Sequence, residues 1–429
     1  MNELLALLAL TSTAAAHHHH GGGDLGPEPF VAEAVQAHPS IAAAERRAEA
    51  MRARTAPAGA LMDPMVSIGV QNLPYAPPSL TATPMTGIRF GISQTFPWPG
   101  KRGLAEEAAT SRADAADAGT LEQRNRLAAM VRSTFYEIHF VDVAINVIRA
   151  NLEIIDGFIE IADAKYRVGR GLQQDILKAR VTKNQLDERL IGLRRQRATL
   201  RVRINSLMAR DPGTRIPRLI DVRITELPPL EAEHLLATAS EHRPLLRRLA
   251  AQIAAADQSR ALADKAALPD FNLAFGYTLR LVEAGRDPID GDDFVSLTAG
   301  VNLPVWSSTK QGPLAEAAAK DAAAARRELE AATLDVRETV QTVLEQTAQL
   351  LEQMELYRSS IIPTTRQSLD ADRIAYQVDK VDFLNLLDIE MRLLSFEVDY
   401  HRLHVEREKL IVQLAEAVGV APSELGRNR

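Results

Sequence analysis

Two histidines near the end of the chain have a spacing that could hold a metal ion. His401 and His404 lie three residues apart, and Glu408 follows one helical turn later. Imidazole nitrogens and a carboxylate oxygen are ligands that zinc accepts. The two histidines also flank Tyr400 and Leu403 of an apolar stripe, and this position favours a packed or solvated helix flank over a metal site.

Three other patterns in the sequence could carry chemistry. The run His17 to His20 could bind metal, and a cloning remnant or a mobile linker explains it equally well. Gly100-Lys101 is similar to the end of a phosphate-binding loop, but Arg102 stands where Ser or Thr would hold magnesium. No Ser/His/Asp order or HExxH pattern supports catalysis. We therefore predict that the protein is not an enzyme and holds no metal and no cofactor.

Charged side chains gather at two predicted turns and have opposite signs. The first turn carries Lys165, Arg167 and Arg170. The second turn carries a set of aspartates, namely Asp370, Asp372, Asp379, Asp382 and Asp388. Opposite charges attract, so we predict that Arg167 or Arg170 pairs with the acidic turn and holds it closed, with Asp372 and Asp379 as the candidate partners.

Composition limits the class of protein. Hydrophobic residues make up 46% of the 429 residues and charged residues 25%, which is too much apolar material for a disordered chain. The net charge of -6 gives no basic surplus that would indicate nucleic acid as a partner. The absence of cysteine excludes disulfides and thiolate sites and fits passage through an oxidising compartment. The high alanine content and only 5% aromatic residues predict long, closely packed helices.

The chain repeats itself once. Pro97 and Pro304 lie 207 residues apart, and Tyr166 and Tyr376 lie 210 apart, in matching surroundings. In each half a helix is followed by two alternating segments, a very long helix and a return helix of about 35 residues. The predicted divisions are a signal-like segment and His/Gly linker over 1–29, a first repeat over 30–210, a proline-rich linker over 211–230, a second repeat over 231–420 and a tail over 421–429.

The long helices carry coiled-coil stripes. The first stripe alternates steps of three and four, as in a left-handed supercoil, through Ile138, Val141, Ile145, Ile148, Leu152, Ile155, Ile159, Ala162 and Tyr166. The second long helix repeats the pattern from Val336 to Ile361, where Pro363 interrupts it, and the return helix continues it from Leu386 to Leu414. The first long helix, over 100–166, would reach about 100 Å.

Four segments of period two predict β-strands. They centre on 66–70, 88–92, 271–279 and 295–301, with apolar residues on one face and small or polar residues on the other. Such segments fit a barrel with lipid outside and water inside, and they fit a half-buried soluble sheet equally well. Four strands cannot close a transmembrane barrel, so closure would need several copies of the chain.

The N-terminus has features of an export signal. An apolar stretch from Leu4 to Ala16 ends in small residues, although Asn2 and Glu3 replace the usual basic residues, which leaves another start site open. No apolar run reaches the length that a transmembrane helix needs.

The repeated order of elements resembles the TolC-type outer-membrane efflux family. The resemblance rests also on the motif Phe96-Pro97-Trp98-Pro99-Gly100-Lys101-Arg102 and on the two turns that begin at Tyr166 and Tyr376. It implies a mixed α and β membrane protein, in which three copies close a twelve-stranded barrel in the outer membrane and extend a helical tunnel through the periplasm. The Phe-Pro-Trp motif is most similar to members paired with heavy-metal exporters of the resistance-nodulation-division class.

The resemblance also assigns roles to the turns. It implies that both turns dock the adaptor, through Val168, Gly169, Arg170 and Gly171 in the first and Val378, Asp379, Lys380 and Val381 in the second. Asp379 stands where the family usually has glycine. Asn385 occupies a position where relatives can carry an aspartate of the pore constriction, so Asp388 is the expected acidic constriction residue.

The resulting hypothesis is a passive exit duct. Its expected partners are two further copies of the chain, a periplasmic adaptor, an inner-membrane pump and outer-membrane lipid, and its expected cargo is metal cations or small toxic compounds. The alternative is a soluble periplasmic coiled-coil adaptor or scaffold, which would also show hairpin heptads. An adaptor should carry a glycine-containing lipoyl-like β segment split by its hairpin, and the sequence has none.

Overall fold

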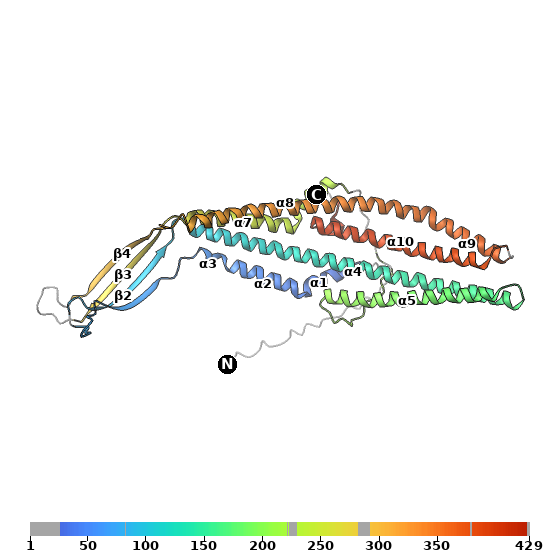
Figure 1. The fold of residues 1–429 in the computed structure, drawn as a ribbon, viewed down its shortest axis with the longest axis horizontal. Coiled ribbons are helices and arrows are strands. Elements are labelled where there is room, and N and C mark those ends of the chain that lie inside the picture. Colours follow the sequence, from blue (N-terminus) through green and yellow to red (C-terminus); the bar gives the residue numbers. More distant parts are fainter. Residues whose placement is uncertain are drawn as a thin grey trace, which may run out of the picture.

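The protein is an elongated bundle of helices with a small sheet at one end (Figure 1). The computed structural model describes residues 26–81, 83–220, 222, 230–281, 292–377 and 380–426. The signal-like segment and His17 to His20 lie outside the described residues, as do Val378 and Asp379.

The elements of the first repeat follow the predicted order. They are α1 (Glu28–Ala37), α2 (Pro39–Ala53), α3 (Thr55–Gly59), β1 (Met65–Gln71), β2 (Gly87–Phe96), α4 (Lys101–Arg167) and α5 (Gln173–Leu207). The 67 residues of α4 form one helix, which confirms the predicted long helix. The 35 residues of α5 return along it and complete the first hairpin.

The second repeat has the same order with one interruption. Its elements are α6 (Ala232–His242), α7 (Pro244–Lys265), β3 (Asp270–Arg280), β4 (Phe294–Asn302), α8 (Gln311–Leu356), the π-helical turn η1 (Tyr357–Ile361), α9 (Ile362–Gln377), α10 (Phe383–Val418) and the short 3₁₀ helix η2 (Pro422–Glu424). Pro363 does not end the helix, because the π-helical turn η1 accommodates it. In this turn the amide of Ile362 bonds back five residues to Tyr357 O.

The predicted stripes form most of the core between the hairpins. Ile138, Val141, Ile148 and Ile155 are at most 1% exposed and pack with residues of α5 and α10. The stripe ends one turn early, because Tyr166 is 45% exposed, so its predicted place in the core is wrong.

The four predicted strands form one antiparallel sheet with the order β1-β2-β3-β4. Ile68 pairs with Phe90, and Ile92 pairs with Phe275, so apolar residues meet on one face. That face is uncovered: Val66 is 76% and Leu297 73% exposed. Within the part of the chain that the structure describes, no second layer of protein covers the apolar side of the sheet, unlike in a soluble half-buried sheet.

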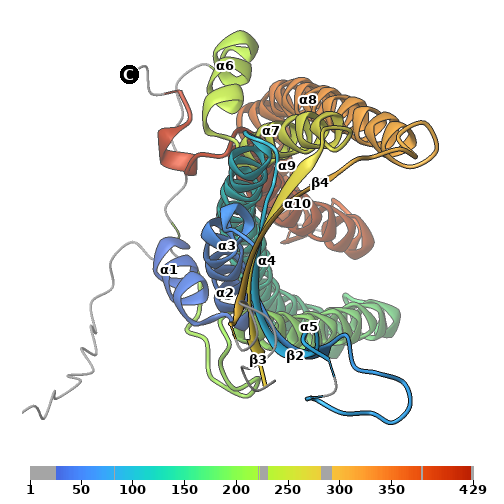
Figure 2. The same cartoon turned by 90° about the vertical axis from the view of Figure 1, so that its left-hand side faces the viewer.

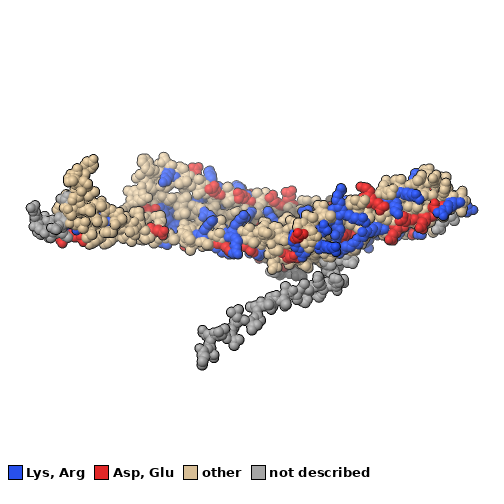
Figure 3. Space-filling model, turned by 90° about the horizontal axis from the view of Figure 1, so that it is seen from below, with Lys and Arg blue, Asp and Glu red and all other residues tan. Residues whose placement is uncertain are grey.

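The wall formed by the sheet and the long helices is curved. Viewed along the long axis, these elements make an open arc, with α1, α2 and α3 on one side of it (Figure 2). Charged side chains are spread along the helical part and nearly absent from the sheet in the view of Figure 3. Within the described residues, every helix is too short or too polar to cross a lipid bilayer.

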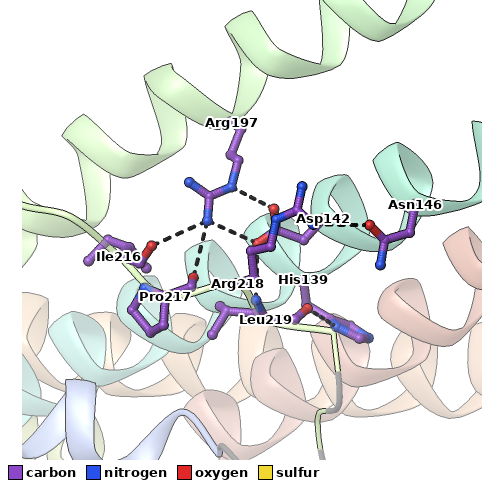
Figure 4. Close-up of polar contacts among 8 residues, drawn as sticks. All are labelled: His139, Asp142, Asn146, Arg197, Ile216, Pro217, Arg218 and Leu219. Atoms are coloured by element: carbon purple, nitrogen blue, oxygen red, sulfur yellow. Dashed lines mark hydrogen bonds and ion pairs between the residues drawn. The ribbon is translucent and has the colours of Figure 1, made fainter. Parts of the chain in front are cut away.

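A buried ion pair ties the chain after α5 to the first hairpin. Arg197 donates from Nε to Asp142 Oδ1 at 2.5 Å, and its Nη2 reaches the carbonyls of Ile216 and Pro217 at 3.3 and 3.1 Å (Figure 4). Asp142 is 1% exposed and also accepts the amide of Leu219 at 3.0 Å. The start of the inter-repeat linker is thus fixed to the middle of the hairpin.

Candidate functional site

The first hairpin turns through a glycine that a side chain would strain. Gly169 has a φ of +75° and its amide bonds Tyr166 O at 3.0 Å, while the amide of Arg170 reaches back to Lys165 O at 2.9 Å. This left-handed turn satisfies the last carbonyls of α4. Val168 is 70% exposed at the tip, and Arg170 is exposed beside it, whereas Gly171 is half-buried.

The second hairpin closes with the same backbone bond. The amide of Lys380 reaches Ala375 O at 2.9 Å, which matches the bond from Arg170 to Lys165. Ala375 and Lys380 are thus bonded across the second turn as Lys165 and Arg170 are across the first. Asp382 then precedes α10, and Lys380 is exposed while Val381 is half-buried.

Lys165 joins the two tips. Its Nζ lies 2.5 Å from the carbonyl oxygen of Tyr376 and 4.0 Å from the centroid of the Tyr376 ring. That ring lies 5.5 Å from the ring of Phe383, which in turn lies 6.5 Å from Phe158 of α4. An ammonium over an aromatic face is attracted by the ring's negative charge distribution. Sequence reasoning expected an acidic partner for the basic tip and missed this aromatic one.

Two predicted charged residues bond within their own helices. Arg167 pairs with Asp163, one turn earlier in α4. Asp388 accepts from Arg392 Nε at 2.8 Å in α10, and both side chains are about two-thirds exposed. Asp372 is half-buried, and Asn385 is exposed. Pairing of the basic turn with the acidic turn and a constriction at Asp388 both stay predictions.

A buried carboxyl lies two residues beyond Asp388. Glu390 is 1% exposed, and its Oε2 has no hydrogen-bond partner among the described residues. Burial raises the pKa of Glu390 to about 7, the neighbouring charge of Glu397 raises it as well, and Arg373 lowers it. The sequence contained a signal for this burial: the positions three and four residues away on both sides are leucines, namely Leu386, Leu387, Leu393 and Leu394.

The surroundings of His401 and His404 indicate a packing role for both histidines. Burial lowers the pKa of His401 and of His404, and the ring of His404 meets the ring of Tyr400 edge-on at 4.6 Å. Glu408 is buried and accepts from Arg407 Nη1 at 2.7 Å. Within the part of the chain that the structure describes, no three His, Cys, Asp or Glu side chains gather in a way that could hold a metal ion.

The sequence matches a family model over both repeats. The model describes outer membrane efflux proteins and matches residues 30–210 and 235–420. The chain belongs to the outer membrane efflux protein family. The resemblance noted from the turns and the Phe-Pro-Trp motif is thereby confirmed, and the periplasmic adaptor is not favoured.

Solved structures of low sequence identity share the fold. The outer membrane protein VceC of Vibrio cholerae is 17% identical, with a TM-score of 0.77 over 92% of this chain and 96% of that one. The CmeC outer membrane channel of Campylobacter jejuni is 14% identical, with a TM-score of 0.75 over 94% and 87%. The MtrE outer membrane channel of Neisseria gonorrhoeae, solved in its open state, is 17% identical, with a TM-score of 0.74 over 94% and 91%.

A search of curated protein sequences found no match. The family and these neighbours are channels, which agrees at family level with a protein that is not an enzyme. The protein is located in the outer membrane and extends into the periplasm.

Proposed function

We propose that three copies of the chain form a passive exit duct for an inner-membrane pump, to which a periplasmic adaptor connects it. The observation that carries this proposal is the four-stranded sheet. Among the described residues, its two outer strands have no further neighbouring strand and its apolar face is uncovered. Four strands are half of the eight that the smallest transmembrane barrels use, and three copies supply twelve. Family membership supports the efflux role.

The uncovered face of the sheet contacts lipid in this proposal. Val66, Ile68, Val70, Phe271, Leu273 and Phe275 are all more than 40% exposed. Phe275→Lys, near the middle of β3, should cost about 2 to 4 kcal/mol in membrane assembly. Asn272→Lys, on the other face, is the matched control and should assemble normally. Equal loss in both variants would argue against lipid contact.

The two tips dock the adaptor in this proposal. A Cβ at Gly169 would meet open space, so a large side chain there projects from the tip into the path of a partner. Gly169→Trp should abolish efflux and leave the yield of trimer unchanged. Gly169→Asn controls for the turn, because Asn tolerates the left-handed conformation. Undiminished efflux in Gly169→Trp would exclude docking at this tip.

The oligomeric state is the first experiment. Sedimentation of detergent-extracted protein should give a trimer that requires detergent, and planar bilayers should show a discrete conductance. A monomer, or a trimer that is soluble without detergent, would overturn the duct. Metal cations and small toxic compounds are the cargo classes to compare in efflux assays with the cognate pump.

A further inference from the structure

A compact polar contact joins the two repeats where the sheet meets the helices. Asp270, at the start of β3, accepts on Oδ1 from the amide of Trp98 and from Lys101 Nζ, each at 2.8 Å. Lys101 also reaches Leu268 O at 2.8 Å, and the Lys101 side chain is 12% exposed. The Trp98 ring stacks on Phe271 with centroids 5.7 Å apart. This contact, the Asp270 junction, fixes the end of β2 against the start of β3.

Because the chain is repeated, the residue types of the Asp270 junction occur a second time: an aspartate before one strand, and a tryptophan and a lysine after another. Asp63 lies 207 residues before Asp270 and two residues before Met65, the first residue of β1. Trp306 and Lys310 follow β4 in the same order as Trp98 and Lys101 follow β2, with Trp306 208 residues after Trp98 and Lys310 209 residues after Lys101.

The turns agree as well. The carbonyl of Trp98 accepts the amide of Lys101 at 3.1 Å, and that of Trp306 accepts the amides of Thr309 and Lys310 at 3.1 and 2.9 Å.

The second set of residues, Asp63, Trp306 and Lys310, does not form the matching contact within one copy. Trp306 is 72% exposed, although Trp98 is half-buried, and Asp63 and Lys310 are both exposed. Among the described residues, neither the Asp63 carboxylate nor the Lys310 ammonium has a hydrogen-bond or ion-pair partner. Their strands are the two edges of the sheet, so the halves cannot meet inside one chain.

The pairing of β2 with β3 predicts the pairing of β4 with β1 of a second copy. Gln94 pairs with Leu273, Ile92 with Phe275 and Phe90 with Tyr277. Moved by the repeat distance of 207 residues, these become three pairs between copies: Val301 with Val66, Ala299 with Ile68, and Leu297 with Val70. All six are exposed and all are apolar. The alignment thus brings the uncovered faces of both edges to the same side, which a shift by one residue would not do.

We propose that Trp306 and Lys310 of one copy bind Asp63 of the next copy. Val301 of the first copy then pairs with Val66 of the second, and this pairing joins the sheets of the two copies. The partner is a second copy of this chain. Two observations support this choice: Lys310 and Asp63 have opposite charges, and the Asp270 junction shows the same residue types in contact within one chain. This inference rests on the proposed trimer and adds which residues join its subunits.

Charge reversal tests the polar contact. Asp63→Lys and Lys310→Asp should each raise the dissociation constant of the trimer by about a hundredfold, because like charges then meet. The double variant restores opposite charges and should recover most of the wild-type assembly. Lys320→Asp, an exposed site further along α8, is the control and should have no effect. Wild-type assembly of both single variants, or no recovery in the double variant, would overturn the contact.

Disulfide cross-linking tests the register, since the chain has no cysteine of its own. Opposed residues of antiparallel strands lie about 4.5 to 5.5 Å apart at Cα, within disulfide range, whereas diagonal neighbours lie about 7 to 8 Å apart. The pairs Val66→Cys with Val301→Cys and Ile68→Cys with Ala299→Cys should link three copies. Ile68→Cys with Val301→Cys, two residues out of register, should link at least about tenfold less.

The outcomes separate this inference from the proposed function. Ile92→Cys with Phe275→Cys, opposed within one chain, shows that oxidation works at this depth. A trimer in sedimentation whose out-of-register pair links best would overturn the register and leave the duct intact. A wild-type monomer would overturn the duct itself.

Discussion

The two hairpins share one repeat pattern but are held by different contacts. In the first, α4 runs uninterrupted, the buried Asp142–Arg197 pair ties it to α5 and the linker, and Lys183 bonds Asp156 at 2.5 Å. In the second, η1 interrupts the outgoing helix, and Glu390 is buried with one carboxyl oxygen that has no hydrogen-bond partner among the described residues. A buried charge whose hydrogen bonds are all made stabilises the fold around it, whereas a buried charge that lacks bonds destabilises that fold. The comparison predicts that the second hairpin is the less stable of the two.

The largest expected effect lies in the first hairpin. Asp142→Ala leaves the guanidinium of Arg197 without its carboxylate and the Leu219 amide without its acceptor, which should cost about 3 to 5 kcal/mol. Thermal unfolding in detergent should show the loss, and hydrogen exchange should rise at 216–219. Asp156→Ala breaks a half-exposed pair and should cost at most about 1 kcal/mol. Similar losses in both variants would remove the distinction between the hairpins.

The second hairpin should respond to pH through Glu390. An unfolded glutamate has a pKa near 4.5, and in the fold the pKa of Glu390 is raised to about 7. Below pH 4.5 both states hold the proton and the group costs nothing. Between these two values the unfolded state releases the proton first, so stability falls as pH rises, by about 3 kcal/mol in total.

Glu390→Gln tests this directly, because it keeps the shape and cannot ionise. The protection of α9 and α10, taken as the exchange rate relative to the intrinsic rate at the same pH, should fall between pH 5 and pH 8 in the wild type and stay constant in Glu390→Gln. Glu352→Gln, an exposed change on α8, should behave as the wild type. If this protection does not change with pH in the wild type, Glu390 does not set the stability of this hairpin.

A smaller effect is expected at Lys165, where the hairpins meet. Lys165→Met keeps the apolar stem and removes both the bond to Tyr376 O and the contact with its ring, at a cost of about 1 to 3 kcal/mol. Exchange at 376 and 383–386 should rise more than at the first tip. Lys178→Met, half-buried on α5, is the control. An unchanged exchange rate in Lys165→Met would show that the aromatic contacts alone hold the tips together.

The fold was predictable because its periodicities are long. A stripe from Ile138 to Ala162 specifies both a helix and its buried face, and alternation over 66–70 specifies a strand and its faces. The π turn before Pro363 was not predictable in kind, since proline signals a break without saying how the backbone accommodates it.

The site was harder to predict because it depends on contacts between distant segments. The turns at Gly169 and Lys380 followed from local turn chemistry. The contact of Lys165 with Tyr376 joins residues of different repeats, and no spacing rule relates them. The matching tyrosines also differ in burial: Tyr166 is 45% and Tyr376 is 7% exposed, although their sequence motifs are alike.

The smallest effect on stability is expected at Asp388, and it would sharpen the comparison of the tips most. The pair with Arg392 is an exposed contact one helical turn apart, so Asp388→Ala should cost only about 0.3 to 0.5 kcal/mol. In a trimer the same carboxylate would occur three times around the axis, where the charges add to one local field. Asp388→Ala should therefore lower cation preference and block by multivalent cations in planar bilayers, while thermal unfolding hardly changes.

Arg167→Ala with Arg170→Ala, on the first tip, should instead raise the open fraction if these residues hold the acidic tip closed. Wild-type selectivity and block in Asp388→Ala would place the constriction elsewhere, and a wild-type open fraction in the double variant would leave Lys165 as the residue that joins the tips.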